Sequence, residues 1–268
     1  LHSTTHSFPT RRSSDLAAEA FAFDTETDSL DPLRANLVGI SLCVEPGKAC
    51  YIPVAHEAPG VAAQLPRDSV LDALRPLLAD PAKKKLGQHG KYDLHVLRRH
   101  GVVVAGYADD TLLESFVLNA GIARHDMDSL AQRHLGYTTI KYEDVAGKGS
   151  KAIAFSQVAL DDATRYAAED ADITLRLHRV LLPKLQAEPG LLSVYRDIEM
   201  PLVPVLARIE ANGVMIDADE LRRQPFAGVH GHAGRRAQER ARGAVGGARA
   251  QARRQPRVAR RVDARRQG

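Results

Sequence analysis

The sequence of 268 residues predicts an α/β fold, with a mixed β-sheet flanked by helices. Three observations support this class. Short runs rich in apolar and β-branched residues come early, apolar residues at helical spacing follow up to residue 224, and the turn sequence EPGK (45–48) joins two of the runs. Strands that come first and helices that follow indicate a sheet with helices packed on it.

The expected strands are short and rich in apolar and β-branched residues. FAFDTET (21–27) is the first, and NLVGISLCV (36–44) pairs with ACYIPVA (49–55) in a hairpin across residues 45–48. KKKLGQ (83–88) and GVVVAG (101–106) are expected to complete the sheet.

The expected helices are amphipathic and have acids near their starts. The first covers 68–80 with Asp68 as its N-cap, and the last, 193–213, ends at the C-cap sequence Asn212-Gly213. Between them the pattern predicts helices at 91–100, 109–121, 126–135 and 163–185.

Both ends of the chain differ from residues 17–224. Residues 225–268 contain 12 Arg and no Lys, with too little apolar content to offset the entropy of ordering. We interpret them as a frameshifted, disordered tail, and the alternative is a genuine Arg-rich tail that binds nucleic acid. HSFPTRRSSDL (6–16) resembles a translated sequencing adapter, so residues 1–16 are interpreted as a non-native segment. With no apolar run long enough for a bilayer, we expect no membrane partner and a cytoplasmic location.

Acidic residues occupy one face of the first expected strand. Asp24 and Glu26 are two residues apart, so their side chains point the same way, about 7 Å apart along the backbone. Two neighbouring carboxylates repel each other unless positive charge lies between them. A divalent cation is the simplest source of that charge.

Two more acids lie on helix faces that should pack. Asp93 shares a face with Leu97, and Asp170 shares a face with Tyr166 and Ile173. Taken singly, each acid is also explained as a surface residue whose helical register is misjudged by one position. Taken together, four such acids favour Mg²⁺ or Mn²⁺, which prefer hard oxygen ligands. Two of these ions about 4 Å apart form a clamp suited to phosphodiester cleavage.

Three segments that contain these acids form a set of motifs. FDTETDSL (23–30), GKYDLHVL (90–97) and YAAEDADIT (166–174) resemble the three exonuclease motifs of the proofreading 3′→5′ exonuclease family. From about residue 21 to 222 the chain resembles the Klenow-type portion of the bacterial DNA polymerase I family. This resemblance implies a ribonuclease H-like sheet, with an exonuclease domain at 17–190. It also implies that 191–224 begin a polymerase region, with its first helix but without its active site.

The resemblance also implies roles for individual residues. It implies two Mg²⁺ or Mn²⁺ ions held by the carboxylates of Asp24, Glu26, Asp93 and Asp170. Asp24 would bridge the two ions, and Tyr166 would help to orient the attacking water. Contacts to the substrate are implied at Thr27, Leu30, Gln88, Tyr92 and Tyr142. Of these, Leu30 would wedge against the terminal base and Tyr142 would offer an aromatic face for stacking.

One departure from the family stands beside these residues. His89 and Gly90 replace the Asn-Leu that the family has before KYD, which adds a titrating group near the metal ligands. These two replacements affect which contacts the chain can make to the terminal nucleotide of a substrate.

The expected function is two-metal hydrolysis of the terminal phosphodiester at the 3′ end of single-stranded DNA. The products would be nucleoside 5′-monophosphates. The enzyme is expected to be a monomer without polymerase activity. In the full-length protein, the missing polymerase region would be its partner. An RNA 3′ exonuclease of the ribonuclease D type and a catalytically silent scaffold domain are the alternatives. The segment IEMPLVPVLARIEANG (198–213) favours the polymerase family, and the four acids with Tyr166 favour an enzyme.

Overall fold

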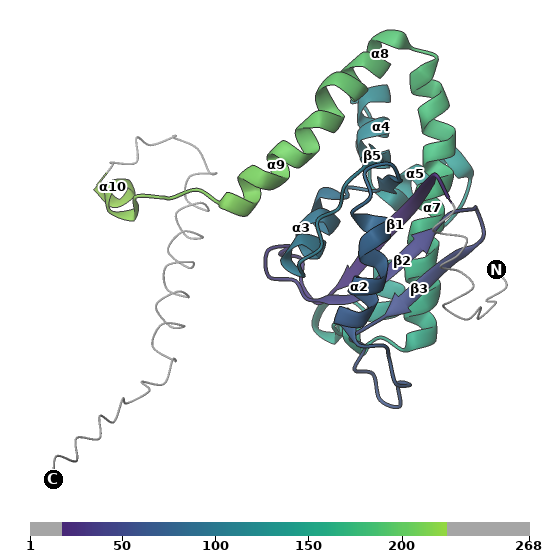
Figure 1. Ribbon diagram of the computed structural model, residues 1–268, viewed down its shortest axis with the longest axis vertical. Coiled ribbons are helices and arrows are strands. Elements are labelled where there is room, and N and C mark those ends of the chain that lie inside the picture. The colour runs from purple at the N-terminus through teal and green to yellow at the C-terminus, as the bar shows by residue number, and fades with distance from the viewer. Residues whose placement is uncertain (1–17, 224–268) are drawn as a thin grey trace. The chain divides into compact units, whose positions relative to one another are not determined.

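The structure is a computed structural model that describes residues 18–223 (Figure 1). The chain divides into two units, the first ending at Gly213 and the second beginning at Val214. In the second unit the described residues form helix α10 (Ala218–Arg223). The expectations for residues 1–16 and 225–268 lie outside the described residues.

A five-stranded mixed sheet forms the centre of the first unit. In spatial order its strands are β3 (Ala49–Pro53), β2 (Leu37–Cys43), β1 (Ala20–Thr27), β4 (Lys84–Gly87) and β5 (Tyr107–Asp110). Strands β1, β2 and β3 pair antiparallel, whereas β4 is parallel to β1 and β5 is parallel to β4. The hairpin between β2 and β3 turns at residues 45–48, where Lys48 N donates to Glu45 O at 2.9 Å. The mixed sheet expected from the sequence is therefore confirmed.

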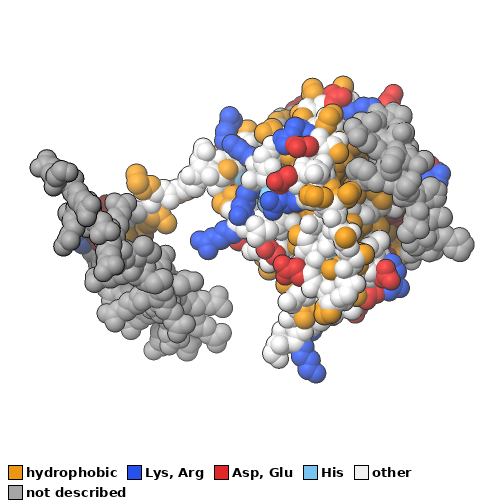
Figure 2. Space-filling view, turned by 60° about the horizontal axis from the view of Figure 1, so that its bottom comes forward, with side chains coloured by type: hydrophobic (Ala, Val, Ile, Leu, Met, Phe, Trp, Pro, Cys, Tyr) orange, Lys and Arg blue, Asp and Glu red, His pale blue; other side chains and the backbone are white. Residues whose placement is uncertain are grey.

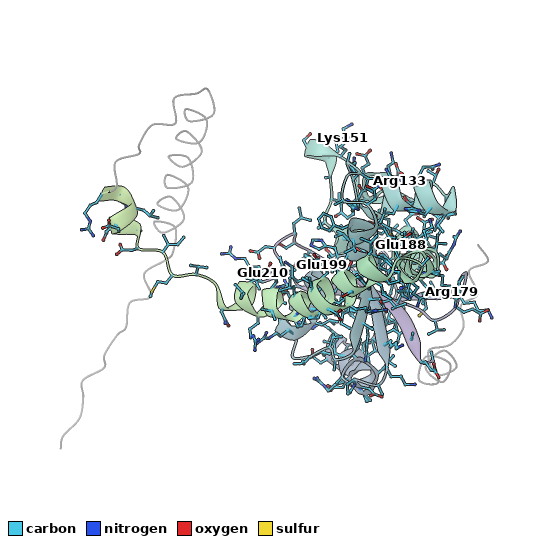
Figure 3. All side chains as sticks on the ribbon, turned by 90° about the horizontal axis from the view of Figure 1, so that it is seen from above. Arg133, Lys151, Arg179, Glu188, Glu199 and Glu210 are labelled. Atoms are coloured by element: carbon cyan, nitrogen blue, oxygen red, sulfur yellow. The ribbon has the colours of Figure 1, made fainter. Side chains whose placement is uncertain are left out.

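Helices cover both faces of this sheet. They are α2 (Arg67–Leu78), α3 (Lys91–Arg99), α4 (Thr111–Leu118), α5 (Met127–Leu135), α6 (Tyr142–Ala146), α7 (Leu160–Gln186), α8 (Pro189–Ser193) and α9 (Met200–Asn212). Figure 1 shows α2 and α3 on one side of the sheet and α7 on the other. A π-helical turn (Val194–Glu199) joins α8 to α9, and Glu188, Glu199 and Glu210 follow one another along this helical segment (Figure 3). None of the described helices is both long and apolar enough to cross a bilayer.

The two faces of the sheet have separate apolar cores. Phe21 and Phe23 of β1 pack with Leu97 of α3, in a cluster that also includes side chains of α2. On the other face, Ala22 of β1 packs with Ala171 of α7. Since side chains alternate along a strand, the next even-numbered side chains of β1 point toward α7.

The helix starts agree in part with the expected capping acids. The Asp110 carboxylate accepts from the first backbone N–H groups of α4, and the Asp126 carboxylate accepts from Ser129 N of α5. Helix α2 differs from the expectation, because its N-cap is Pro66 and Asp68 lies within its first turn. A negative charge in the first turn of a helix still stabilises the helix, because it interacts favourably with the helix dipole.

The expected strand at 101–106 is wrong. The strand that pairs with β4 is Tyr107–Asp110, which follows directly. Gly101 and Gly106 have φ values of 77° and 69°, so left-handed residues bound the segment and interrupt regular pairing. Val102 is fully buried while Val103 is 68% exposed, so the β-branched run is a connection with a buried anchor at its start.

The turn before α3 gives a physical reason for the departure at residues 89 and 90. His89 has a φ of 58°, a left-handed value that Asn, Asp and His adopt more readily than other non-glycine residues. A Cβ at Gly90 would lie 2.1 Å from the Tyr107 hydroxyl, so the Tyr107 side chain fills that space. The Asp110 carboxylate accepts from His89 N at 3.1 Å and from Gly90 N at 3.0 Å.

Gly90→Ala should therefore lower the free energy of unfolding by about 1–3 kcal/mol, because the added methyl overlaps a packed phenol. The Tyr107 hydroxyl is held by a hydrogen bond to Asp110 at 2.7 Å, so the ring cannot move away freely. Urea unfolding of variant and parent measures the change. The matched control is Gly190→Ala in α8, where nothing lies within 4 Å of an added Cβ. Equal stability of the two variants would contradict the packing role of Tyr107.

Surface charges of both signs are interspersed. Figure 2 shows Lys and Arg side chains among Asp and Glu side chains on the face in view. Local pairs such as Lys48–Glu45 at 2.8 Å and Arg75–Asp72 at 3.0 Å are solvent-exposed, so each contributes little to stability.

Candidate functional site

A pocket of about 410 Å³ lies at the carboxyl end of β1. One part of its lining comes from residues 24–30, which are the end of β1 and the loop that follows. The rest comes from Tyr92 of α3 and from Tyr142, Ala154, Phe155, Tyr166 and Asp170. No Lys, Arg or His occurs among the described residues that line it, and its charged groups are all acids.

Three carboxylates meet in this pocket. Strand alternation puts Asp24 and Glu26 on the face that α7 covers, and α7 brings Asp170 to the same place. One carboxylate oxygen from each residue lies within 4.8 Å of the other two. The register of β1 and β2 shifts directly after Glu26, an irregularity of the kind found beside active sites.

Asp93 reaches the same end of β1 by a different route. It belongs to α3, is 3% exposed, and its Oδ1 accepts from Thr25 N at 3.0 Å and from the Thr25 hydroxyl. Strand β1 extends beyond Ala22, its last residue paired with β4, which leaves room for this contact. Asp93 thus lies beside Asp24 but is not among the residues that line the pocket.

The pKa values of all four acids are raised in the folded protein. Burial raises the pKa of Asp24 from 3.8 to about 7. Burial also raises the pKa of Glu26, and the charges of Asp24, Asp170 and Asp93 raise it further. The pKa values of Asp93 and Asp170 are raised as well, first by burial and then by the charge of Asp24. As anions, these groups need a compensating positive charge.

The residues present fit a divalent cation. Glu26 is 7% exposed, and its Oε1 has no hydrogen-bond partner among the described residues. A buried carboxylate oxygen without a partner is costly, and a bound cation would satisfy it. Three converging carboxylate oxygens are hard donors of the kind that Mg²⁺ and Mn²⁺ prefer.

In the presence of a chelator, the fold should lose stability as the pH rises from about 4 to about 7. The pKa of Asp24 in the folded protein is about 7, above its unfolded value of 3.8. The folded state therefore binds more protons in this window, so raising the pH favours the unfolded state. The melting temperature in EDTA should fall by on the order of 5 °C between about pH 5 and about pH 8.

Two additions sharpen this measurement. Mg²⁺ should restore the melting temperature at the higher pH more than at the lower pH, because the carboxylates bind it as anions. Asp24→Asn should reduce the pH dependence in EDTA, since it removes one of the coupled acids. A melting temperature in EDTA that does not change over this pH range would contradict the electrostatic account.

Tyr166 lies one turn before Asp170 on α7, and its hydroxyl donates a hydrogen bond to that carboxylate. Burial raises the pKa of Tyr166, and the charges of Asp170 and Glu26 raise it further. The phenol therefore stays protonated at neutral pH. It can orient a neighbouring oxygen as a hydrogen-bond donor, but it cannot act as a base.

Four of the five substrate contacts expected from the sequence line the pocket. Leu30 is 97% exposed at the tip of the loop after β1, and Tyr142 is 47% exposed on α6. The hydroxyls of Thr27 and Tyr92 are hydrogen-bonded to each other at the same rim.

Gln88, the fifth expected contact, is not among the lining residues. Its Nε2 donates to His125 O at 2.9 Å, and its Oε1 accepts from the Thr111 hydroxyl. These bonds use both ends of the amide to join the turn before α3 to α4 and the segment before α5.

The sequence reasoning missed two residues of the site. Thr25 binds Asp93 through both its amide and its hydroxyl, and its one signal was its place between Asp24 and Glu26. Phe155 lines the pocket and is 1% exposed, in a 3₁₀ turn (Phe155–Gln157) where no periodic pattern marks it.

Comparison with known sequences gives two findings. A family model described as 3′-5′ exonuclease matches residues 4–186. DNA polymerase I of Pseudomonas aeruginosa is 57% identical over 206 residues, which cover 76% of this chain and 23% of the relative. The chain thus spans about a quarter of the length of that relative.

Solved structures show the fold. RNase D of Escherichia coli, an exoribonuclease, has a TM-score of 0.55 at 21% identity, covering 75% of this chain and 48% of that one. Brucella melitensis NrnC with bound Mg²⁺ has a TM-score of 0.55 at 20% identity, covering 79% of this chain and 91% of that one. The mixed sheet with helices on both faces is accordingly the ribonuclease H-like fold.

Proposed function

This chain belongs to the family of 3′-5′ exonucleases, and we propose on that basis that it hydrolyses the 3′-terminal phosphodiester of single-stranded DNA. The products would be nucleoside 5′-monophosphates. The observation that carries the proposal is the meeting of Asp24, Glu26 and Asp170 oxygens within 4.8 Å, in a pocket that also holds Tyr166.

The carboxylates would hold two divalent cations, Mg²⁺ or Mn²⁺. Asp24, Glu26 and Asp170 are the ligands that line the pocket, and Asp93 lies beside Asp24 as the fourth. When bound, such ions supply the positive charge that the attacking and departing oxygens of a phosphodiester require. The unpartnered Oε1 of Glu26 supports its role as a ligand.

Tyr166 would orient the attacking water. Its protonated hydroxyl lies next to Asp170, so its single O–H would turn from the carboxylate to a water that itself donates to Asp170. This arrangement fixes the direction in which the water presents its lone pair. A preorganised polar contact of this kind favours the transition state without taking part in proton transfer.

The rim of the pocket would bind the last nucleotides of a strand. A volume of about 410 Å³ suits one nucleotide, and Leu30 and Tyr142 offer apolar and aromatic surface to unstacked bases. Thr27 and Tyr92 offer hydroxyls beside them. Since this surface would contact base faces and not a duplex groove, it favours a single-stranded end.

The full-length protein would be a DNA polymerase I of the bacterial cytoplasm, with this domain as its proofreading part. The identity of 57% to the Pseudomonas relative supports DNA as the substrate. We propose that the chain is a monomer, that it lacks polymerase activity, and that the polymerase region is its partner in the longer protein.

A competition experiment tests the choice of substrate. A DNA strand and an RNA strand of the same sequence, with different dyes at their 5′ ends, are incubated together with the chain and Mg²⁺. The DNA should shorten from its 3′ end well before the RNA. Preferential shortening of the RNA would favour the ribonuclease D-type alternative, and intact strands of both kinds would favour the scaffold alternative.

A further inference from the structure

Four ring-bearing side chains form a continuous row behind the pocket. They are Tyr51 of β3, His56 of the following loop, Phe155 of the 3₁₀ turn and Tyr166 of α7. Successive ring centroids are 5.7, 5.7 and 5.8 Å apart, which is contact distance for aromatic rings. We call these four residues the aromatic row.

Polar contacts fix the first two rings of the aromatic row. The Tyr51 hydroxyl and His56 Nε2 are hydrogen-bonded at 2.8 Å, and both residues are buried. The backbone of His56 is held by Gln64, which accepts from His56 N and donates to His56 O, both at 2.8 Å. The Tyr51 phenol also fills the space over Gly39, where a Cβ would lie 2.2 Å from its oxygen.

Phe155 lies between the fixed ring of His56 and the ring of Tyr166 and contacts both. It is 1% exposed, with His56 against one side of its ring and Tyr166 against another. The loop and the 3₁₀ turn are joined directly, because Glu57 N donates to Ser156 O at 2.6 Å. Phe155 therefore has little freedom to move relative to the sheet.

Among the described residues, two aromatic rings contact Tyr166, and Phe155 is the buried one of the two. Tyr166 also contacts the ring of Tyr142, whose centroid is 6.1 Å away but whose side chain is 47% exposed. The hydroxyl of Tyr166 is hydrogen-bonded to Asp170. This one contact does not fix the plane of the ring, so packing must set it. Phe155 is the buried aromatic ring in contact with Tyr166, within the apolar cluster against which Tyr166 packs.

We propose that Phe155 is a positioning residue for the exonuclease reaction. Phe155 acts by holding the Tyr166 ring so that the Tyr166 hydroxyl stays at Asp170. The inference rests on the proposed function and assigns a role to a residue that lacks polar chemistry of its own. If Phe155 acts through the Tyr166 hydroxyl, removing its ring should matter only while that hydroxyl is present.

A double-mutant cycle tests this dependence. Phe155→Leu should lower kcat by roughly 10- to 100-fold with little change in KM, because a small displacement of a catalytic group is costly. In the Tyr166→Phe background the same change should lower kcat by less than about 2-fold, since no hydroxyl is left to misplace. An equal fold-loss in both backgrounds would overturn the proposal.

A matched control separates positioning from general packing. Phe21→Leu removes the same ring from a fully buried site, but in the core on the opposite face of the sheet. Its kcat should stay within about 2-fold of the parent, because sites without shared contacts behave independently. If Phe155→Leu does not fold, Phe155→Met keeps most of the buried volume and removes the ring.

A spectroscopic readout is independent of activity. The chain contains 7 Tyr, so fluorotyrosine labelling gives seven ¹⁹F resonances, and the one missing in Tyr166→Phe belongs to Tyr166. In EDTA and without DNA, Phe155→Leu should shift that resonance, whereas Phe21→Leu should not. An unshifted resonance would overturn the proposal. A parent that does not degrade DNA would refute the proposed function, and the resonance would still decide whether Phe155 positions Tyr166.

Discussion

Asp24→Ala should abolish the degradation of DNA, with a rate loss of roughly 10⁴-fold or more. Asp24 lies at the centre of the acidic cluster, since its charge raises the pKa values of Glu26, Asp93 and Asp170. A side chain next to all the other proposed ligands should affect the binding of every divalent ion at the site. The measurement is the rate at which a labelled single strand is shortened in Mg²⁺.

The same change should leave the fold intact. Removing one of four mutually repelling acids lowers the electrostatic cost of the folded state, so stability in EDTA should be equal or higher. Asp161→Ala is the matched control, because Asp161 is an exposed acid in the first turn of α7 and outside the pocket. Near-parental activity of Asp24→Ala would mean that these carboxylates are not catalytic and would favour the scaffold alternative.

Tyr166→Phe should lower the rate by roughly 10²–10³-fold, the loss typical of one preorganised polar contact. The change deletes the hydrogen bond to Asp170 and keeps the ring, with its contacts to Phe155 and Tyr142. Since the carboxylates are untouched, the Mg²⁺ concentration that gives half of the maximal rate should change little. Rates measured over a range of Mg²⁺ concentrations separate the two effects.

Tyr137→Phe is a close control for this prediction. The Tyr137 hydroxyl donates to Glu169 at 2.7 Å, so this change also deletes a phenol–carboxylate bond to α7, one residue from Asp170. Tyr137 does not line the pocket, and its variant should keep near-parental activity. A loss of similar size in both variants would indicate a general effect on α7 and not a role for Tyr166 in the reaction.

Local periodicity was sufficient to predict part of the site. The period of a strand places Asp24 and Glu26 on one face, and the period of a helix places Tyr166 one turn from Asp170. Both relations hold in the structure. Which face each element presents to the others follows from tertiary packing, so the meeting of these acids was implied by family resemblance and not by spacing.

Other features depend on contacts that no local pattern records. The hydrogen bonds that Thr25 donates to Asp93 require that β4 stop pairing at Ala22 of β1, and the ring contact of Phe155 is with His56, more than 90 residues earlier in the chain. The strand expected at 101–106 failed because β-branched residues also suit an extended connection, and glycines with positive φ bound that segment.

The direction of degradation tests the central claim most directly. A single strand of DNA labelled at its 5′ end is incubated with the chain in Mg²⁺, and the products are followed over time. The proposed site predicts a ladder of labelled strands that shorten one nucleotide at a time from the 3′ end, with unlabelled nucleoside 5′-monophosphates, and no reaction in EDTA. Immediate release of a labelled mononucleotide, equal degradation in EDTA, or an intact strand in Mg²⁺ would contradict the assignment of Asp24, Glu26 and Asp170 as the catalytic centre of a 3′→5′ exonuclease.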